Sequence, residues 1–359
     1  MEGLSAESRG PSQALRVVAI GGGTGLSTIL KGLKRYVAPV PVGLLEQPSE
    51  YLISDLSAVV TVSDNGGSSG RLRREFNMLP PGDIRSCIVA LSEDETLLSR
   101  LFRHRFEKGS GLEGHSFGNL FLAALTSITG DFAEAVRLSS EILATRGHIY
   151  PATTANVQLE ALMEDGSRVR GETEITASKN RIKELFLQPS QPDPLPETFE
   201  AIARADIVTI GPGSLFTSLI PNLLVRGMAE AIEKCNATRI YICNLMTQAN
   251  ESLGRTAADH VRALDDHAGR HLFDYALINR TPVSPKLAER YAAEGATQIV
   301  ADLDAVQELG VDPILGDYLE EYDVARHATD RVAHDIINLR LDPKRIRDQN
   351  ATTQVGSAQ

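Results

Sequence analysis

Short apolar runs without helical periodicity alternate with amphipathic segments along most of the chain. Residues 16–20 form a β-branched run, which leads through a glycine-rich turn at residues 21–25 into a helix-like segment at residues 26–33. Another such strand, at residues 58–62, runs into a polar, glycine-dense turn at residues 63–70. Because strands that alternate with helices are typical of parallel sheets, the sequence predicts an α/β fold, a Rossmann-like three-layer αβα arrangement with a mainly parallel sheet.

The same pattern returns in the second half of the chain. Strands are predicted at residues 207–210, 239–243 and 275–278, and a long helix is predicted after the turn at residues 211–214. Residues 207–225 carry no charge, but they contain glycines, prolines and hydroxyl side chains. This composition favours a buried strand, turn and helix over a membrane span.

Capping residues predict where several helices begin. Asp83 is a candidate N-cap, and Asp131 is a candidate N-cap for a helix that runs to Thr145. The segment at residues 114–119 opens another apolar helix, which continues through Leu125, and the last helix is predicted to end near Leu341.

A period of two residues between about 155 and 187 predicts an antiparallel hairpin inserted into the α/β fold. The hairpin turns at Asp165–Gly166, and Ile175 belongs to its second part. Residues 188–196 carry four prolines and are predicted to be an extended connector. We therefore expect one domain over residues 16–341, with disordered tails at residues 1–15 and 342–359.

The formal net charge of −11 argues against general adhesion to nucleic acid or to an anionic membrane. The three cysteines have neither CxxC spacing nor an even count, so they indicate neither a disulfide framework nor a zinc site. The first fourteen residues lack the apolar segment of a secretory signal. A cytoplasmic protein is the resulting expectation.

The first glycine-rich turn is a candidate phosphate site. Missing side chains let backbone N–H groups approach phosphate oxygens, and the following helix adds positive potential at its N-terminus. The predicted contacts are Gly22, Gly23, Thr24 and Gly25. The turn lacks the third glycine of the dinucleotide fingerprint and the Lys-Ser/Thr of a P-loop, so a tight turn without a ligand is the alternative.

The second turn has the denser set of chemical groups. Its glycines can form an anion-binding nest, Asp64 can hold a metal ion, a ribose or a proton, and Arg71 can pair with phosphate. The residues assigned to the site here are Ser63, Asp64, Asn65, Gly66, Gly67 and Arg71. A flexible polar turn is the alternative.

Further candidates follow other strands or begin helices. Asp83 and Arg85 suit ligand binding as well as capping and ion pairing, and His115 at a helix start can donate to an anion. The turn after residue 210 repeats the phosphate-binding pattern, with Ser214 as either a cap or a ligand contact. The added site residues are Asp83, Arg85, His115, Gly118, Asn119, Gly211, Pro212, Gly213, Ser214 and Asn244.

Other motifs do not support a catalytic site. His267 and His271 are four residues apart, but without a ligand cluster they are better explained as core or surface histidines. No cysteine has an adjacent histidine that would indicate a nucleophile. Covalent catalysis is therefore not indicated.

Six motifs in order resemble the bacterial gluconeogenesis factor family (YvcK, also called GlmR), which belongs to the CofD-like superfamily with 2-phospho-L-lactate transferase. The resemblance covers residues 16–341. Its motifs are GGGTGLSTILKGLK, TVSDNGGSSGRLR, PPGDIRSC, GHSFGNL, IGPGSLFTSLIPNLL, and the late YAAEGA with ARH.

The resemblance implies binding of a UDP-sugar, notably UDP-N-acetylglucosamine, and a link between carbon supply, cell-wall precursor synthesis and cell shape. It places sugar-nucleotide contacts at Tyr291 and Arg326, for which core packing and a surface helix charge are the alternatives. Asn65 stands where many relatives carry a second aspartate, which weakens a two-carboxylate metal site at Asp64. Residues 37–55 resemble an insertion.

Two functions follow from these observations. The first is a ligand-sensing regulator whose nucleotide changes its contacts with an amino-sugar or cell-wall enzyme; homo-oligomerisation stays open. The second is a transferase of the 2-phospho-L-lactate type, in which Asp64 would be the catalytic residue and help to bind Mg²⁺. A nicotinamide-dependent oxidoreductase is a weaker third interpretation, which the missing third glycine disfavours.

Overall fold

The computed structural model describes residues 14–38, 52–93, 97–178, 180–249 and 251–344. The predicted tails and the suggested insertion at residues 37–55 therefore fall largely outside the described residues. The first strand begins at Leu15, one residue before the predicted domain boundary.

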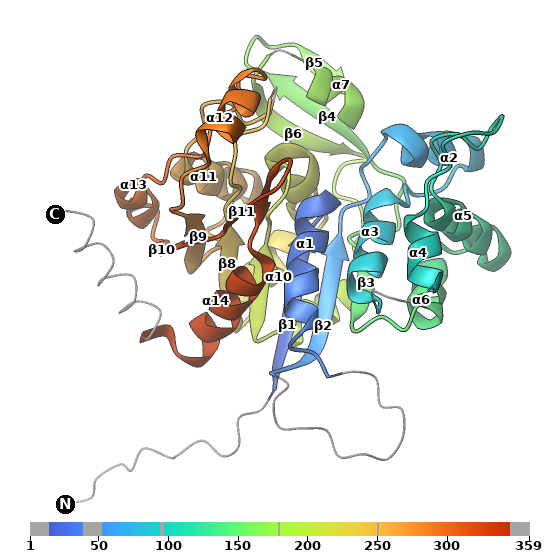
Figure 1. Ribbon diagram of the computed structural model, residues 1–359, viewed down its shortest axis with the longest axis horizontal. Coiled ribbons are helices and arrows are strands. Elements are labelled where there is room, and N and C mark those ends of the chain that lie inside the picture. The colour runs from blue at the N-terminus through green and yellow to red at the C-terminus, as the bar shows by residue number, and fades with distance from the viewer. Residues whose placement is uncertain (1–13, 39–51, 94–96, 179, 250, 345–359) are drawn as a thin grey trace, which may run out of the picture.

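A seven-stranded, fully parallel sheet forms the centre of the molecule, in the order β10-β9-β8-β7-β1-β2-β3 (Figure 1). Its strands are β1 (Leu15–Gly21), β2 (Ile53–Val60), β3 (His148–Pro151), β7 (Ile207–Ile210), β8 (Thr238–Ile242), β9 (Tyr275–Asn279) and β10 (Asp312–Gly316). The strand order reverses between β1 and β7. In open parallel sheets such a reversal opens a crevice at the carboxyl ends of the strands.

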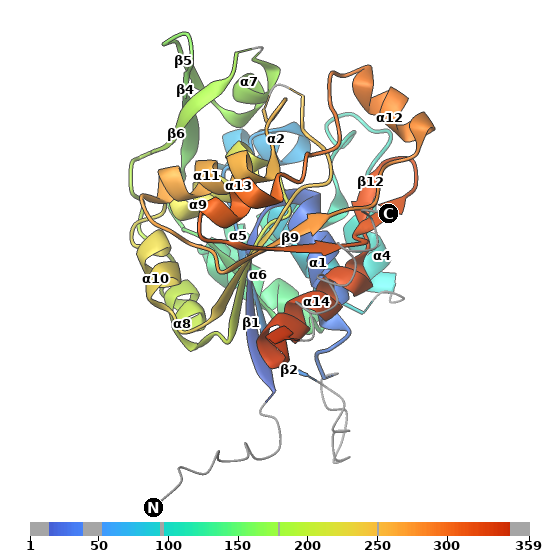
Figure 2. The same cartoon turned by 90° about the vertical axis from the view of Figure 1, so that its left-hand side faces the viewer.

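Helices cover both faces of the sheet, which confirms the predicted three-layer α/β class. Helices α1 (Gly23–Lys34), α3 (Gly82–Leu91) and α14 (Thr329–Leu341) pack together on one face. Helices α8 (Pro196–Arg204) and α10 (Met228–Lys234) lie on the opposite side (Figure 2). The β-branched residues of the inner strands are almost completely buried, because a parallel sheet is covered on both sides.

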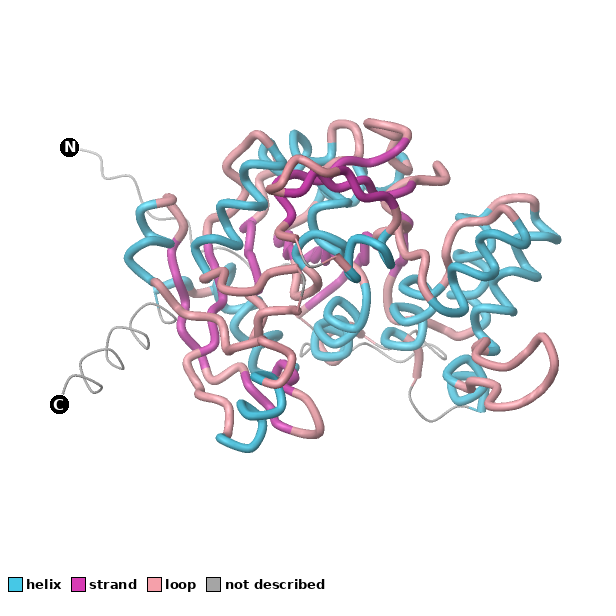
Figure 3. Tube along the Cα trace, turned by 90° about the horizontal axis from the view of Figure 1, so that it is seen from above, coloured by secondary structure: helices cyan, strands magenta, loops and turns pink. Residues whose placement is uncertain are grey.

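The view from above shows helices around the central strands, including the remaining helices of the chain (Figure 3). They are α2 (Gly67–Phe76), α4 (Leu97–Arg103), α5 (Phe117–Thr129), α6 (Phe132–Ile142), α7 (Glu172–Ala177), α9 (Ile220–Leu223), α11 (Ala257–Ala268), α12 (Pro285–Ala292) and α13 (Leu303–Glu308).

The inserted segment is larger than the predicted hairpin. It forms a three-stranded antiparallel sheet of β4 (Gln158–Met163), β5 (Arg168–Arg170) and β6 (Ile182–Gln188), in the order β5-β4-β6. The strands β4 and β5 flank the predicted Asp165–Gly166 turn, but Ile175 lies in α7 and not in a strand. A single buried side chain suits either a strand or one helical turn, so the alternation could not distinguish them.

The long helix predicted after residue 214 is broken into three pieces. A π-helical turn (Leu215–Leu219) precedes α9, and α10 follows after a further turn. Pro221 lacks the N–H that a regular helix would use at that position, and the amides of Leu219 and Ile220 bond five residues back. No single described helix is long and apolar enough to cross a bilayer. The segments Leu215–Leu223 and Met228–Lys234 are long and apolar enough only when they are taken together, and the chain bends by 76° between them.

Other boundaries were also predicted imperfectly. Asp131 caps α6 as expected, accepting a hydrogen bond from the Glu134 amide, but that helix ends at Ile142. Pro81, not Asp83, is the N-cap of α3. Four strands were not predicted, namely β3, β10, β11 (Leu319–Glu321) and β12 (Ala325–His327). Strands β11 and β12 have only three residues each, which is too few to show a periodic pattern.

Candidate functional site

A cavity of about 510 Å³ lies at the carboxyl ends of β1, β7 and β8, beside the reversal in strand order. Twelve of the predicted site residues line it. They are Gly22, Gly23, Thr24, Gly25, Asp64, Asp83, Pro212, Gly213, Ser214, Asn244, Tyr291 and Arg326. We call this space the strand-end cavity. The fold thus brings together predicted residues that are up to 304 positions apart.

The N-terminus of α1 faces the strand-end cavity without a side-chain cap. Gly22 is the N-cap, and the Gly23 amide donates to the Asp83 carboxyl group. The next two amides, those of Thr24 and Gly25, have no hydrogen-bond acceptor among the described residues. An uncapped helix start with free amides and a positive dipole end is suited to bind an anion.

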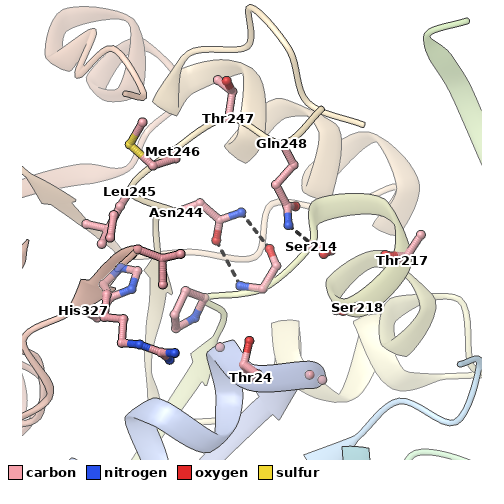
Figure 4. Close-up of a pocket in the computed structure, with 18 of the residues that line it drawn as sticks. Thr24, Ser214, Thr217, Ser218, Asn244, Leu245, Met246, Thr247, Gln248 and His327 are labelled. Carbon is pink, nitrogen blue, oxygen red and sulfur yellow. Dashed lines mark hydrogen bonds between the residues drawn. The ribbon is translucent and has the colours of Figure 1, made fainter. Parts of the chain in front are cut away.

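Asn244 holds the loop at residues 211–214 at the opposite wall. Its Oδ1 accepts from the Gly213 amide at 3.0 Å, and its Nδ2 donates to the Gly213 carbonyl at 2.7 Å (Figure 4). Gln248 Nε2 donates to Ser214 Oγ at 3.0 Å. Ser214 is the N-cap residue of the π-helical turn, as one of its two predicted roles requires, but its side chain makes no capping hydrogen bond.

A buried carboxylate occupies the helix start that follows this loop. Glu251 Oε1 accepts from the amides of Phe216 and Thr217 at 2.8 and 2.9 Å. Burial raises the pKa of Glu251, although these hydrogen bonds oppose the rise. The amides of Phe216 and Thr217 at the start of the π-helical turn are therefore already satisfied, unlike those of Thr24 and Gly25 in α1.

Three carboxyl groups share one side of the strand-end cavity. Asp64 and Glu172 approach from the turn after β2 and from α7, and Asp83 approaches from the first turn of α3. Burial raises the pKa of Asp83 to about 7, and the charge of Asp64 adds to the rise. Burial and the charge of Asp64 also raise the pKa of Glu172. Near neutral pH this wall therefore carries less negative charge than its composition suggests.

Several predicted residues of the second turn have structural partners instead of facing the strand-end cavity. Ser63 Oγ lies 3.0 Å from Thr61 Oγ1, and Gly66 donates its amide to Asp64 Oδ1. The Asn65 amide donates to Glu172, and Asn65 Oδ1 accepts from the amide and hydroxyl of Thr173. Asn65 thus joins the turn to α7.

The remaining predicted residues lie outside the strand-end cavity. Gly211 (φ +90°) follows β7, and a Cβ there would lie 2.7 Å from the Ile242 carbonyl oxygen. Gly118 gives room to Arg85 and Phe102. Gly67 and Arg71 border a second cavity, behind which His115 and Asn119 bond to Ser68.

Tyr291 and Arg326, assigned only by resemblance, both reach the strand-end cavity. Tyr291 lies on α12, and its hydroxyl accepts from the Ala325 amide at 3.1 Å. Arg326 lies on strand β12, not on a helix, so the surface-helix alternative is wrong. The next residue, His327, is buried and bonds through Nε2 to the Cys243 carbonyl oxygen at 3.0 Å. Burial lowers the His327 pKa to about 4, so the imidazole is neutral and donates.

Other lining residues were not identified from the sequence. They are Glu172, Thr217, Ser218, Leu245, Met246, Thr247, Gln248, Val324, Ala325 and His327. The residues of the turn after β8 could have been identified from the sequence, because polar residues there follow a buried strand, and ligands bind at the carboxyl ends of such strands. Glu172 offered no signal and the β11–β12 hairpin offered only the ARH motif of the resemblance, since both segments reach the cavity through tertiary packing.

Comparison with known proteins agrees with the fold and with the motifs. The 2-phospho-L-lactate transferase CofD family model matches residues 17–319. A gluconeogenesis factor from Halalkalibacterium halodurans is 47% identical over 323 residues, which cover 89% of this chain and 95% of that protein. The gluconeogenesis factor of Bacillus subtilis is 46% identical over 329 residues, 91% of this chain and 98% of that protein.

A crystal structure of a Bacillus halodurans protein has the same fold. It superposes with a TM-score of 0.84 at 45% sequence identity, covering 90% of this chain and all of that chain. The matched family model, the two relatives and this structure all span the strands that build the strand-end cavity. The chain belongs to the CofD family, and within it to the group of the gluconeogenesis factors.

Proposed function

We propose that this protein is a cytoplasmic regulator that binds a sugar nucleotide of the UDP-N-acetylglucosamine type and links carbon metabolism to cell-wall precursor synthesis and cell shape. The observation that carries the proposal is the composition of the strand-end cavity. One space holds the open amides at the start of α1 together with Tyr291 and Arg326. The name of the relatives, gluconeogenesis factor, supports a role in carbon metabolism.

The charges in the strand-end cavity suit a diphosphate. The α1 amides of Thr24 and Gly25 can donate to its oxygens, and the Arg326 guanidinium supplies a positive charge on the same cavity. Because Asp83 has a pKa of about 7 and that of Glu172 is raised, these two groups repel the anion less than ordinary carboxylates would.

The volume and the polar lining suit the rest of such a ligand. A cavity of about 510 Å³ falls within the range of small-molecule sites. Thr24 and Ser218 line it with hydroxyl groups, which can bond to sugar hydroxyls and to a base (Figure 4). On this proposal, the bound nucleotide connects the α1 turn with the β11–β12 hairpin and so changes the surface offered to a partner enzyme.

Isothermal titration calorimetry with UDP-N-acetylglucosamine tests the proposal. We expect binding by the wild-type protein and an affinity at least tenfold weaker in Arg326→Ala. Arg340→Ala, on the exposed side of α14, is the matched control and should stay within twofold of wild type. The absence of binding heat at millimolar ligand would exclude the proposal.

The carboxyl cluster favours a second candidate, a transferase of the 2-phospho-L-lactate type. Asp64 and Asp83 lie beside the proposed diphosphate position, where concentrated negative charge calls for a cation. Among the described residues, no group of three or more His, Cys, Asp or Glu is arranged to hold a metal ion. Mg²⁺ would therefore combine Asp64 with phosphate oxygens of the substrate.

The transferase proposal has its own assay. Product formation from a guanylylated phospholactate donor and a deazaflavin acceptor would be followed in the wild-type protein and in Asp64→Asn. We expect turnover to be lost in Asp64→Asn and kept in Asp304→Asn, an exposed control on α13. Equal turnover in Asp64→Asn and wild type would show that Asp64 takes no part in the reaction.

A further inference from the structure

A second cavity, of about 780 Å³, borders the first turn of α2. Its lining comes from α2 and from the loop between α4 and α5, and it shares no described lining residue with the strand-end cavity. The lining residues are Gly67, Ser68, Arg71, Arg105, Gly109, Ser110, Gly111, Glu113 and Gly114. We call it the arginine cavity. The turn after β2 separates the two spaces, with Asp64 on one and Gly67 on the other.

Two guanidinium groups dominate the chemistry of the arginine cavity. Arg71 Nη2 donates to the Glu113 carbonyl oxygen at 2.7 Å, and Arg105 donates to the Gly114 carbonyl oxygen. Within the described part of the chain, neither arginine forms an ion pair with a carboxylate. Each guanidinium therefore keeps donors and its full charge for another partner.

Neighbouring groups respond to the positive charge of the two arginines, although Glu113 places one carboxylate on the same lining. Burial lowers the pKa of His115, and the charges of Arg71 and Arg105 lower it further, against an opposing effect of Glu75. Burial lowers the pKa of Arg85 too, and the charge of Arg105 adds to that effect. This cluster of positive charges, in a protein whose net charge is −11, favours the binding of an anion.

The backbone of α2 adds donors to the same cavity. The Gly66 amide donates to Asp64, and the Gly70 amide donates to the Gly66 carbonyl oxygen. The amides of Gly67 and Ser68, the first residues of α2 and part of the cavity lining, have no hydrogen-bond acceptor among the described residues. Ser68 fixes this helix start, because its Oγ lies 2.9 Å from His115 Nδ1 and accepts from Asn119 Nδ2 at 3.1 Å. The amides and the two arginines thus have a defined relative position.

From this arrangement we infer that the arginine cavity is a second anion site, separate from the nucleotide site, which binds a phosphate group between Arg71, Arg105 and the start of α2. The phosphate is either the free ion or the phosphoryl group of a small metabolite. Two guanidinium groups and a helix start match the charge and the several acceptor oxygens of a phosphate dianion. The inference holds whether or not the strand-end cavity takes a UDP-sugar.

Calorimetric titration with inorganic phosphate at constant ionic strength tests the site. We expect Arg71→Ala/Arg105→Ala to lower the phosphate affinity at least tenfold. The double variant Arg74→Ala/Arg100→Ala removes the same charge from exposed positions outside the cavity and should stay within twofold of wild type. An equal loss in both double variants would show only a general charge effect and would overturn the inference.

A second variant leaves both arginines and their loop contacts in place. Ser110→Asp puts a negative charge on the exposed loop of the cavity and should also lower phosphate affinity at least tenfold, whereas Ser110→Asn should not. Wild-type phosphate affinity in Ser110→Asp or in Arg71→Ala/Arg105→Ala overturns the inference. A parallel titration with glycerol 3-phosphate supports a free-phosphate site if it binds no tighter than phosphate, and a metabolite site if it binds tighter.

Titration of the same variants with UDP-N-acetylglucosamine separates this inference from the proposed function. Arg71→Ala/Arg105→Ala should bind the nucleotide within twofold of wild type. Loss of nucleotide and phosphate binding together would assign both arginines to the nucleotide site and would overturn the separate site. If wild-type protein binds phosphate but no nucleotide, the proposed function fails and the second site stands.

Discussion

Gly25 and Pro212 pack backbone against backbone, although they are 187 residues apart. A Cβ added at Gly25 would lie 2.2 Å from the Pro212 carbonyl oxygen, well inside any real contact distance. The glycine turn after β1 and the loop after β7 can therefore meet only because Gly25 has no side chain. This contact sets the width of the strand-end cavity between the two loops.

Gly25→Ala should separate these loops. We expect a loss of about 1–3 kcal/mol in unfolding free energy, as for other overpacked sites, together with weaker UDP-N-acetylglucosamine binding. Gly21→Ala is the matched control, because its Cβ would meet Leu219 and Leu26 at an ordinary 3.5 Å. Urea unfolding and calorimetry measure the two effects. Equal stability of the two variants would contradict the proposed backbone contact.

Asn244→Ala should release the loop at residues 211–214. The variant loses both hydrogen bonds to Gly213, and we expect the stability to fall by about 1–3 kcal/mol. Nucleotide affinity should fall as well, since Asn244 and Gly213 both line the strand-end cavity. Asn236→Ala, at an exposed position before β8, is the control. Chemical unfolding that shows no difference between the two variants would argue against this role.

Glu251→Ala should leave the amides of Phe216 and Thr217 buried without an acceptor. Because the lost acceptor is a carboxyl group in the interior, we expect a cost of about 1–3 kcal/mol or more in unfolding free energy. Glu251→Gln keeps an acceptor oxygen and should cost less. Glu289→Ala on the exposed side of α12 serves as the reference. Thermal unfolding would contradict this role if Glu251→Gln and Glu251→Ala lost the same stability.

Asp83 should make stability depend on pH. Its pKa rises from the ordinary 3.8 of an aspartate side chain to about 7 in the folded protein, so folding favours the protonated form. The stabilising contribution is complete below pH 3.8 and is lost as the pH rises through 7. Over that window the change is on the order of 4 kcal/mol, because one pKa unit corresponds to about 1.4 kcal/mol.

Asp83→Asn tests this dependence. Compared with the wild-type protein, the variant should be of similar stability near pH 4 and more stable above pH 7. Unfolding curves at a series of pH values measure the difference, with Asp304→Asn as the exposed control. Nucleotide affinity should also fall less with rising pH in Asp83→Asn, since the ionised carboxylate that repels the diphosphate is absent. Parallel stability profiles for Asp83→Asn and wild type would refute the raised pKa.

Local sequence patterns were sufficient for the α/β class and for the turns at the strand ends. The β-branched run before Gly21 and the one before Gly211 identify buried parallel strands, because such strands are apolar on both faces. Each of these strands must end at the same edge of the sheet, so the turns that follow could be assigned to one site. The cap at Asp131 was predictable for a similar reason, since capping is a contact between near neighbours.

Tertiary structure decided which of those residues share a cavity and which only hold the fold. Asn65 and Arg71 stand in the same glycine-rich motif as Asp64, yet Asn65 bonds to α7 and Arg71 faces the arginine cavity. Glu251 and Glu172 gave no local signal, because their partners come from segments 34 and 107 residues away. The spacing of apolar residues along a strand or helix indicates which of its sides is buried. Which other element covers that side depends on the long-range packing of the whole chain.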